Sequence, residues 1–426
     1  MNTLIEELTW RGMIQDIMPG TAEQLSKELT HGYIGFDPTA DSLHIGSLVP
    51  ILLLVHLQKA GHKPFALVGG ATGIVGDPTG KSEERIMLTK EILDNNQIGI
   101  ASQLEKFLNF GEALPNAAVL VNNYDWFKNI SFLDFIKDAG KHITVNYMMA
   151  KDSVKKRLES EQGMSFTEFT YQLIQGYDFY WLHQHQNCKL QMGGSDQWGN
   201  IVTGTELIRR KTGQQAFAFT CPLIKKADGG KFGKSEAGNV WLDANKTSPF
   251  HFYQFWLNAS DSDAEGWIKI FTFLAKDVIE VLIKKHNADP AERLLQKSLA
   301  KEITIFVHGQ AAFESALVTT EKLFTLSEAG VEQLTEDDLS AIDGIEKVDI
   351  TSQALLTTDI TTLLTTAGIF ISKGEARKLI LNGGLSINKV KALDPAQLLT
   401  MQHLLHKKYV LIQKGKRNYY LLTVSE

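Results

Sequence analysis

The sequence predicts an α/β protein in which a parallel β-sheet carries helices on both faces. Over the first 225 residues, short runs rich in β-branched and aromatic residues alternate with longer helical patterns, as in GYIGF followed by SLVPILLLVHLQKAG. Several of these helical patterns end at a glycine, which is typical of a helix C-terminus. The alternation predicts a sheet whose ligands gather at the carboxyl ends of its strands.

Each element follows from the pattern of its own segment. The expected strands are GYIGF, KPFALVGG, AAVLVNNY, KLQMGG and AFAFTCPLI, separated by helical runs such as NIVTGTELIRRKTG. Between about residues 125 and 185 the pattern is mostly helical, which predicts an insertion between two halves of the sheet. The expected domains are 1–225 for the sheet with its insertion, 226–247 for a loop that contains KFGKS, 248–324 for a helical domain, 325–352 for an acidic linker and 353–426 for a small terminal domain.

The terminal segment combines a helix, a hairpin and a positive charge. Ser372 and Glu375 have capping-box spacing before the helix GEARKLILN, and the strand LSIN and the hairpin KKYVLIQKGKRNYYLL follow. Between Ile371 and Tyr420 there are ten Lys/Arg and two Asp/Glu, whereas the whole chain has a formal net charge of −6. A basic end on an acidic body is expected where one end binds a polyanion, and a solvated basic face is the alternative.

The composition is that of a soluble globular protein, with 43% hydrophobic and 22% charged residues. No apolar run approaches the roughly 18 residues of a membrane span, and the N-terminus lacks the basic start of a secretory signal. Cys188 and Cys221 are the only cysteines, and neither belongs to a CxxC pair. We therefore expect a cytoplasmic protein with no membrane segment and no metal site of its own.

The turn LHIGSL stands where the first strand gives way to a helix. The start of that helix would present free N–H groups and a positive dipole to a phosphate. Gly46 would let a flat ligand approach the backbone, and His44 and Thr39 could hydrogen-bond phosphate oxygens. Four residues recur by chance, so this motif alone is also compatible with ordinary turn residues.

Two glycine-rich stretches, GGATGIVGDPTGKSEER and KFGKS, come close to a phosphate-binding P-loop. That template needs a glycine five positions before the Gly-Lys pair, but Val75 and Asp228 occupy those positions. Asp77 is better suited to an ammonium group than to a phosphate. The lysines and arginine nearby, Lys81, Arg85, Lys231 and Lys234, could close over a polyphosphate, and exposed basic turns are the alternative.

Two further segments place polar residues in a pattern. In TYQLIQGYD, Tyr171, Gln175 and Asp178 share one helical face, which is either a solvated stripe or the lining of a pocket. Aromatic residues around this helix favour burial, and buried polar groups need partners that a ligand could supply. In LQMGGSDQWGN, Asp196 and Gln197 follow a strand, where an aspartate can bind both hydroxyls of a ribose.

The five motifs GYIGFDPTADSLHIGSL, GGATGIVGDPTGK, SFTEFTYQLIQGYDF, LQMGGSDQWGN and KFGKS occur in this order. With these motifs in this order, the chain closely resembles the bacterial tyrosyl-tRNA synthetases, a family of class I aminoacyl-tRNA synthetases. HIGS and KFGKS stand where that class carries HIGH and KMSKS. The resemblance covers nearly the whole chain. It implies a Rossmann-like catalytic domain with a helical insertion, an α-helical domain on the anticodon side and a small α+β RNA-binding domain.

The resemblance implies that tyrosine reacts with ATP to give tyrosyl-adenylate and pyrophosphate, and that the tyrosyl group then passes to the 3′ end of tRNA(Tyr). It also implies Mg²⁺ entering with ATP, no bound organic cofactor, and a homodimer formed through the helical insertion. The substrate carboxylate is itself the nucleophile. Catalysis then consists of positioning and charge stabilisation, without a covalent enzyme intermediate.

The same resemblance implies four groups of site residues. The tyrosine site comprises Tyr33, Asp37, Asp77, Tyr171, Gln175, Asp178 and Gln197. The ATP site comprises Gly35, His44, Gly46, Ser47, Gly194, Asp196, Lys234 and Ser235. The catalytic groups at the phosphates are Thr39, His44, Lys81, Arg85, Lys231 and Lys234. The tRNA contacts are Arg377, Lys378, Lys414, Lys416 and Arg417.

Within the tyrosine site, Tyr33 and Asp178 would hydrogen-bond the phenolic hydroxyl. The ammonium group would lie among Asp77, Tyr171 and Gln175, with Gln197 near the carboxylate, and Asp196 would bind the ribose of ATP.

Two residues depart from the family pattern. Ser47 replaces the second signature histidine, and Ile34 stands where relatives often carry a cysteine. These differences affect the expected ribose and adenine contacts and leave the amino-acid pocket intact. The competing readings are the sibling tryptophan enzyme, a P-loop kinase or ATPase, and an RNA-binding protein without catalysis.

Overall fold

The structure is a computed structural model that divides into two compact units, residues 1–246 with 257–303 and residues 247–256 with 304–426. The described residues are 3–77, 88–111, 113–159, 163–230, 232–235, 238–325, 328–332, 334–340, 342, 344–415 and 418–425. Each unit is described by itself.

The first unit is built on a six-stranded sheet in the order β1-β6-β5-β2-β3-β4. Its strands are β1 (Asp16–Ile17), β2 (His31–Phe36), β3 (Lys63–Val68), β4 (Val119–Asn122), β5 (Cys188–Gly194) and β6 (Phe217–Cys221). Neighbours from β6 to β4 run parallel, and β1 pairs antiparallel with β6. The five predicted strands are confirmed. β1 was not predicted because two residues carry no periodic pattern.

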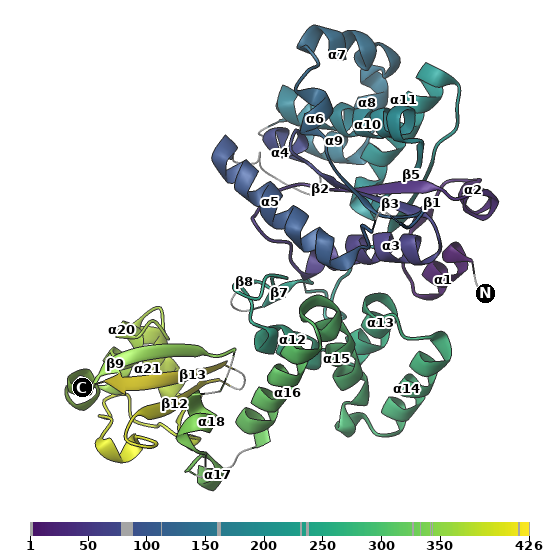
Figure 1. Cartoon of the computed structure of the whole chain (residues 1–426). Helices are drawn as coiled ribbons and strands as arrows, with labels where there is room; N and C mark the ends of the chain where they lie inside the picture. The colour runs from purple at the N-terminus through teal and green to yellow at the C-terminus, as the bar shows by residue number, and fades with distance from the viewer. Residues whose placement is uncertain are drawn as a thin grey trace. The chain divides into compact units, whose positions relative to one another are not determined.

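The connections between strands place helices on both faces of this sheet. Helix α3 (Leu48–Lys59) joins β2 to β3, and α11 (Trp198–Thr212) joins β5 to β6. Because these two crossovers run in opposite directions along the sheet, their helices lie on opposite faces (Figure 1). The strand order reverses between β2 and β5, and a ligand crevice is expected beyond the carboxyl ends of these two strands.

The predicted helical insertion lies between β4 and β5. It contains α6 (Tyr124–Phe127), α7 (Phe132–Asp138), η2 (Gly140–His142), α8 (Val145–Met149), α9 (Asp152–Leu158) and α10 (Phe166–Gln186). In α10, Ser165 and Glu168 form a reciprocal capping box, and Asn187 closes the helix at φ 50°. Both ends of α10 are thereby set by local sequence, and the helix packs on β5 and α11 (Figure 1).

The other helices of the first unit frame the sheet and lead onward. They are α1 (Leu4–Trp10), α2 (Thr21–Lys27), η1 (Ile45–Ser47), α4 (Thr72–Val75), α5 (Lys90–Phe107), η3 (Ser195–Gln197), α13 (Asp261–Phe271), α14 (Lys276–Ala288) and η4 (Pro290–Glu292). The short pair β7 (Lys234–Ser235) and β8 (Gly238–Asn239) belongs to the predicted KFGKS loop. Helices α12 (Pro249–Leu257) and α15 (Leu294–His308) each contribute residues to both units.

The second unit ends in a five-stranded sheet in the order β11-β10-β12-β13-β9. Its elements are α16 (Gln310–Thr325), α17 (Glu328–Glu332), α18 (Glu336–Ser340), β9 (Glu346–Thr351), α19 (Ser352–Thr357), α20 (Ile360–Thr366), α21 (Lys373–Leu381), β10 (Leu385–Ile387), β11 (Val390–Lys391), η5 (Met401–His403), β12 (Tyr409–Lys414) and β13 (Asn418–Ser425). The predicted helix, strand and basic hairpin of this segment are confirmed.

The segment 325–352, expected to be a linker, differs from that expectation. It contains two short helices and β9, which pairs in parallel with β13 and completes the small sheet. In β9, Val348 and Ile350 alternate with polar residues and pack on the core of the small domain, but this short pattern stands in a polar, acidic stretch whose composition predicted a linker. Charged residues on such an edge strand are usual because they discourage pairing with other chains.

Among the helices that the structure describes, none is long and apolar enough to cross a membrane. Both cysteines are free thiols buried in the first sheet.

Candidate active site

The loops that leave β2 and β5 meet at the reversal of strand order. Asp37 and Thr39 follow β2, while Asp196 and Gln197 lie in η3 directly after β5. Since these two parallel strands are neighbours, their carboxyl ends lie side by side. Four of the predicted site residues are therefore brought to one edge of the sheet, where an α/β fold binds its ligand.

Asp178 of α10 is a buried carboxylate held by two donors. Trp126 Nε1 donates to its Oδ1 at 2.9 Å, and Asn123 Nδ2 donates to its Oδ2 at 3.0 Å. Its side chain is 2% exposed, and burial raises the pKa of the carboxyl to about 8 despite these two hydrogen bonds. A carboxyl with such a pKa lacks sufficient stabilisation for its charge, and a further donor would supply it.

Tyr33 of β2 presents a buried hydroxyl to the same region. Its ring packs against Phe179 at 5.4 Å between centroids, and its hydroxyl has no hydrogen-bond partner among the described residues. Burial and the nearby charge of Asp178 raise the pKa of this phenol, which therefore keeps its proton. A ligand hydroxyl can accept from the Tyr33 hydroxyl and donate to the Asp178 carboxyl at the same time. Tyr33 and Asp178 together therefore select a group that both donates and accepts a hydrogen bond.

Two glutamines add unpartnered oxygens on this side of the sheet. Gln191 of β5 is the register partner of Tyr33, so both side chains leave the same face. Its Oε1 and that of Gln175 on α10 are buried without a hydrogen-bond partner in the described part of the chain. Buried polar atoms are nearly always satisfied in folded proteins. Together with the Tyr33 hydroxyl, these atoms indicate that a polar ligand completes the pocket.

Asp37 connects the pocket to α4 and α10. Its Oδ1 accepts from Thr72 Oγ1 at 2.6 Å and its Oδ2 accepts from the Tyr171 hydroxyl at 2.7 Å. Thr72 in turn accepts from Asn123 Nδ2 at 3.1 Å, and Asn123 also binds Asp178. One hydrogen-bonded network therefore joins the two aspartates. Burial and the charges of Asp37 and Asp77 raise the pKa of Tyr171, which reflects a locally negative environment suited to an ammonium group.

Asp77 and Gln197 form the next contact, toward η3. Gln197 Nε2 donates to Asp77 Oδ2 at 2.7 Å and lies 3.4 Å from Asp196 Oδ2. Gln197 Oε1 accepts from Asn200 at 3.3 Å. A Cβ on Gly194 would lie 2.5 Å from Asp196 Oδ1, so glycine is needed there for the aspartate to reach its position.

The HIGS turn has a geometry that the sequence did not predict. His44 Nδ1 accepts from the Gly46 N–H at 3.0 Å, and a Cβ on Gly46 would lie 2.6 Å from His44 Cε1. A side chain at position 46 would therefore displace the His44 ring from this position. Ser47 precedes α3, and its side chain makes no cap hydrogen bond to that helix among the described residues. Thr39 and Gly35, also predicted here, are exposed.

The KFGKS loop lies against this turn. The Ile45 N–H donates to the carbonyl of Val240 at 2.9 Å, and the Val240 N–H donates to the carbonyl of Gly233 at 3.1 Å. The backbones of Lys234 and Asn239 pair in the β7–β8 hairpin. The structure therefore brings the two signature segments together. The predicted residues Lys81, Arg85, Lys231, Lys416 and Arg417 lie outside the described residues, and only the backbone of Lys234 and Ser235 is described.

The predicted tRNA contacts in the second unit differ in their surroundings. Arg377 and Lys378 are exposed on α21. Lys414 Nζ lies 2.9 Å from Glu375 Oε1, donates to the carbonyl of Ile369 and lies over the Phe370 ring. Its charge is paired within the unit, so Arg377 and Lys378 are the more available cations for a phosphate backbone.

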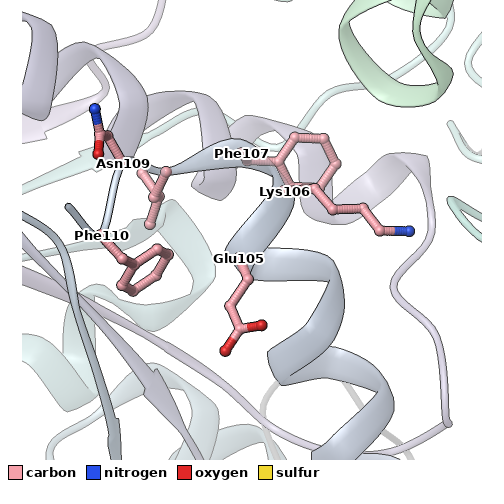
Figure 2. A pocket seen from close by; sticks show the side chains of 6 residues that line it. Glu105, Lys106, Phe107, Asn109 and Phe110 are labelled. Atoms are coloured by element: carbon pink, nitrogen blue, oxygen red, sulfur yellow. The ribbon is translucent and has the colours of Figure 1, made fainter.

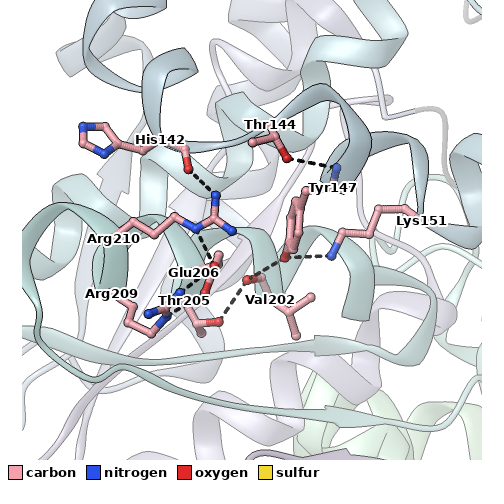
Figure 3. Close-up of polar contacts among 9 residues, drawn as sticks. All are labelled: His142, Thr144, Tyr147, Lys151, Val202, Thr205, Glu206, Arg209 and Arg210. Atoms are coloured by element: carbon pink, nitrogen blue, oxygen red, sulfur yellow. Dashed lines mark hydrogen bonds and ion pairs between the residues drawn. The ribbon is translucent and has the colours of Figure 1, made fainter.

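A second polar cluster joins the insertion to α11 (Figure 3). Arg210 donates to the carbonyl of His142 at 2.7 Å and to Glu206, whose pKa is lowered to about 2 by hydrogen bonds from Arg209 and Arg210. Lys151 Nζ donates to the Tyr147 hydroxyl at 2.8 Å. These contacts connect η2, α8 and α11, and their main effect is to hold the insertion on the sheet domain.

The pocket in Figure 2, about 640 Å³, lies elsewhere. It is lined by residues 105–110 at the end of α5, which leads into the amino end of β4. It therefore opens at the sheet edge opposite the candidate site. The polar ends of Glu105, Lys106 and Asn109 point in different directions (Figure 2), so they do not converge on a ligand.

Four residues that contact or face the predicted ones were not predicted. Asn123 directly follows β4, Trp126 lies in α6, Thr72 begins α4, and Gln191 lies in β5 as the register partner of Tyr33. Polar residues directly after the strands at AAVLVNNY and KPFALVGGAT were the available signal, because parallel strands deliver such residues to one edge.

Known proteins resemble this chain along its whole length. The family described as tRNA synthetases class I (W and Y) matches residues 26–325, and the tyrosine–tRNA ligase SYY-like C-terminal domain matches residues 339–422. The tyrosine–tRNA ligase of Bacteroides thetaiotaomicron is 57% identical over 98% of this chain and 99% of the relative. The tyrosine–tRNA ligase of Flavobacterium johnsoniae is 57% identical over 100% of both chains. A C-terminally truncated mitochondrial tyrosyl-tRNA synthetase from Aspergillus nidulans superposes with a TM-score of 0.68 at 30% identity, covering 76% of this chain and 95% of that one.

Proposed function

The chain belongs to the class I tRNA synthetases (W and Y), and from this premise we propose that it is a tyrosine–tRNA ligase. It activates L-tyrosine with ATP to tyrosyl-adenylate and pyrophosphate, and then transfers the tyrosyl group to the 3′ end of tRNA(Tyr). The observation that carries the choice of amino acid is the buried, unpartnered Tyr33 hydroxyl beside the Asp178 carboxyl.

This pair discriminates among aromatic amino acids by hydrogen bonding. A phenolic hydroxyl can accept from Tyr33 and donate to Asp178. The indole of tryptophan only donates, and phenylalanine does neither. Sites built to bind a hydroxyl reject the analogue that lacks it by roughly 10⁴–10⁵, and tyrosyl-tRNA synthetases are the standard example of this effect. The residues therefore support tyrosine over the two other side chains.

The rest of the pocket suits the α-amino and carboxylate groups. Asp77, Tyr171 and Gln175 are the proposed partners of the ammonium group, with Asp37 orienting Tyr171 through their 2.7 Å hydrogen bond. Gln197 is the proposed neighbour of the carboxylate. A carboxylate oxygen of tyrosine attacks the α-phosphorus and the bond to the pyrophosphate oxygen breaks. Pyrophosphate leaves with the electron pair of that bond, and tyrosyl-adenylate stays bound for the transfer to tRNA. The enzyme contributes alignment and stabilisation of charge on the phosphates.

The nucleotide side is proposed to lie along η1 and η3. Asp196 binds the ribose, the HIGS turn faces the phosphates with Thr39 and His44, and Lys81, Arg85, Lys231 and Lys234 close on the pyrophosphate. Gly35, Gly46, Ser47, Gly194 and Ser235 complete this side. Mg²⁺ enters with ATP, because a bound triphosphate carries its own cation-binding oxygens. A P-loop ATPase remains disfavoured by Val75 and Asp228 in the required glycine positions.

Assembly and tRNA binding complete the proposal. Residues 1–225 form the catalytic domain, 248–324 the helical domain on the anticodon side, and the terminal domain binds tRNA through Arg377, Lys378 and their basic neighbours. Exposed apolar side chains on the insertion support a homodimer through that surface, with Phe132, Leu133 and Val145 at 64%, 76% and 58% exposure. The two buried thiols fit a reducing cytoplasm.

The test is exchange of labelled pyrophosphate into ATP, measured with tyrosine, phenylalanine, tryptophan or no amino acid. We expect exchange with tyrosine and at most a trace with the other two. Exchange with tryptophan alone would identify the sibling enzyme. Formation of ADP without any amino acid would support the ATPase reading instead, and absence of every activity would leave an RNA-binding protein.

A further inference from the structure

Arg11 is a buried arginine that lies outside the proposed site. Its side chain binds three backbone carbonyls. It caps the C-terminal end of α1 and is 3% exposed. Its guanidinium donates to the carbonyls of Lys269 at 2.6 Å, Thr272 at 2.7 Å and Leu274 at 2.8 Å. The Glu7 carboxylate lies 2.8 Å from its Nε and balances its charge.

Two of those carbonyls, of Lys269 and Thr272, belong to the C-terminal end of α13, and that of Leu274 lies in the segment that leads to α14. The last carbonyls of a helix have no partner within the helix and carry its negative dipole end, so a cation that binds them stabilises that end. Without the guanidinium, one buried and two partly buried acceptors would lose their donor, at a cost greater than that of one ordinary hydrogen bond. Arg11 therefore fixes where α13 ends relative to α1.

The same end of α13 holds the signature loop. Phe232, the aromatic residue of KFGKS, lies 5.0 Å from Trp267 and 5.3 Å from Phe271 between ring centroids, the second pair stacked at 17°. Phe271 is the last residue of α13 and lies in sequence between two of the carbonyls that Arg11 binds. The aromatic platform for the loop and the arginine clamp therefore occupy the same helical turn.

From Phe232 the connection continues to the HIGS turn. The carbonyl of Gly233 accepts from Val240, and the carbonyl of Val240 accepts from the Ile45 N–H. We propose that Arg11 is a positioning residue for adenylate formation: by fixing the end of α13 it places Phe232 and, through it, the KFGKS loop against the HIGS turn. This inference rests on the proposed function, since it concerns the rate at which the signature loops act on ATP.

The experiment measures tyrosine-dependent pyrophosphate exchange by Arg11→Met in the full chain. We expect kcat to fall about tenfold, because misplacement of a catalytic loop by about 1 Å can cost up to 10²-fold. The KM for tyrosine should change less than twofold, because neither Arg11 nor the residues it binds belong to the proposed amino-acid pocket. If Arg11 only stabilised the fold, Arg11→Met would lower the amount of active enzyme. The kcat per active site and the KM for tyrosine would then both stay at their wild-type values.

Arg293→Met is the matched control. Arg293 donates to the carbonyls of Leu257, the last residue of α12, and Ala259, which lies just before α13, away from Trp267 and Phe271. It also binds two backbone carbonyls near α13 but is exposed and does not contact the C-terminal end of that helix through these bonds, so its loss should leave kcat within twofold of wild type. If Arg11→Met behaves like Arg293→Met, the proposed positioning role is wrong.

A double-mutant cycle gives a second, independent readout. Phe232→Leu weakens the aromatic anchor, and we expect it to lower kcat about as much as Arg11→Met. If both act through one path, the double variant should lose about tenfold, whereas independent effects would multiply to about 100-fold. Multiplication would overturn the inference. Failure of wild type to exchange pyrophosphate with tyrosine would instead contradict the proposed function, so the two failures are distinguishable.

Discussion

The proposed amino-acid pocket and the proposed phosphate side of the site are built in different ways. In the pocket, Tyr33, Tyr171 and Asp178 are 1%, 4% and 2% exposed. Hydrogen bonds through Asp37, Thr72 and Asn123 join Tyr171 to Asp178, while the Tyr33 hydroxyl has no partner among the described residues. On the phosphate side, Thr39 and Gly46 are exposed, and His44 Nδ1 accepts a hydrogen bond from the Gly46 N–H within the same turn. The first region is a set of buried side chains with unsatisfied polar atoms, and the second is a surface of turns.

The difference follows from what each region must recognise. An uncharged phenol is selected by buried groups, because an unmade hydrogen bond in a dry pocket costs far more than one in water. A triphosphate is bound by N–H groups and cations that approach it from solvent. Substitutions in the pocket should therefore act on substrate affinity, and substitutions in the turns should act on rate.

The largest effect on rate is expected from Lys234→Ala. If this lysine stabilises charge on the departing pyrophosphate, exchange should fall roughly 10²–10³-fold, while equilibrium binding of tyrosine stays within twofold. Lys225→Ala, an exposed lysine earlier in the same segment, is the control. Equal rates for Lys234→Ala and wild type would remove Lys234 from the mechanism.

Asp178→Asn should produce the largest change in affinity. The asparagine amide has one acceptor oxygen where the carboxyl has two, so one of its donors is left unpaired at a cost of about 1.5–3 kcal/mol, which should raise the KM for tyrosine roughly 10- to 100-fold. The KM for ATP should change much less, because Asp178 belongs to the pocket. A parallel rise of both constants would contradict the separation of the two regions.

The same variant tests the buried charge through pH. Burial raises the pKa of Asp178 from 3.8 to about 8, so the folded chain binds a proton that the unfolded chain releases. Its contribution to the free energy of unfolding is therefore complete below about pH 4 and is lost as the pH rises toward 8. In thermal melts between pH 5 and 8, wild type should lose more stability than Asp178→Asn. Identical pH profiles would show that the carboxyl is ionised throughout.

Tyr33→Phe should raise the KM for tyrosine less than Asp178→Asn does. Its hydroxyl has no partner among the described residues, so its removal should leave the stability of the free protein unchanged or slightly higher. Tyrosine then loses one hydrogen bond of about 0.5–1.5 kcal/mol, which corresponds to a rise in KM of roughly 2- to 12-fold. A destabilised free protein would indicate that the hydroxyl already has a partner, such as an ordered water.

Ser47→Ala is expected to have the smallest effect. Within the described residues Ser47 makes no cap hydrogen bond to α3, so thermal stability should not change. The KM for ATP should rise less than about threefold, in line with at most one exposed hydrogen bond. A tenfold rise would show that the serine substitutes fully for the signature histidine.

The sequence predicted those site residues whose spacing along the chain determines which way their side chains point. The i, i+4, i+7 spacing on α10 predicted that Tyr171, Gln175 and Asp178 share a face, and the structure places that face on the pocket. It did not reach Asn123 and Thr72, because their importance lies in contacts with residues more than 30 positions away. β9 was missed for a related reason, since only its pairing with β13 makes it a strand.

By itself, the sequence determined the alternating α/β pattern, the strands and the family resemblance, because these depend on local periodicity and on motifs read in order. The tertiary structure alone decided which polar groups meet. It joined Asp37 to Asp178 through Thr72 and Asn123, placed the His44 ring where a side chain at position 46 would displace it, and paired Lys414 with Glu375. Burial and hydrogen-bond partners are properties of neighbours in space, and local sequence carries no record of them.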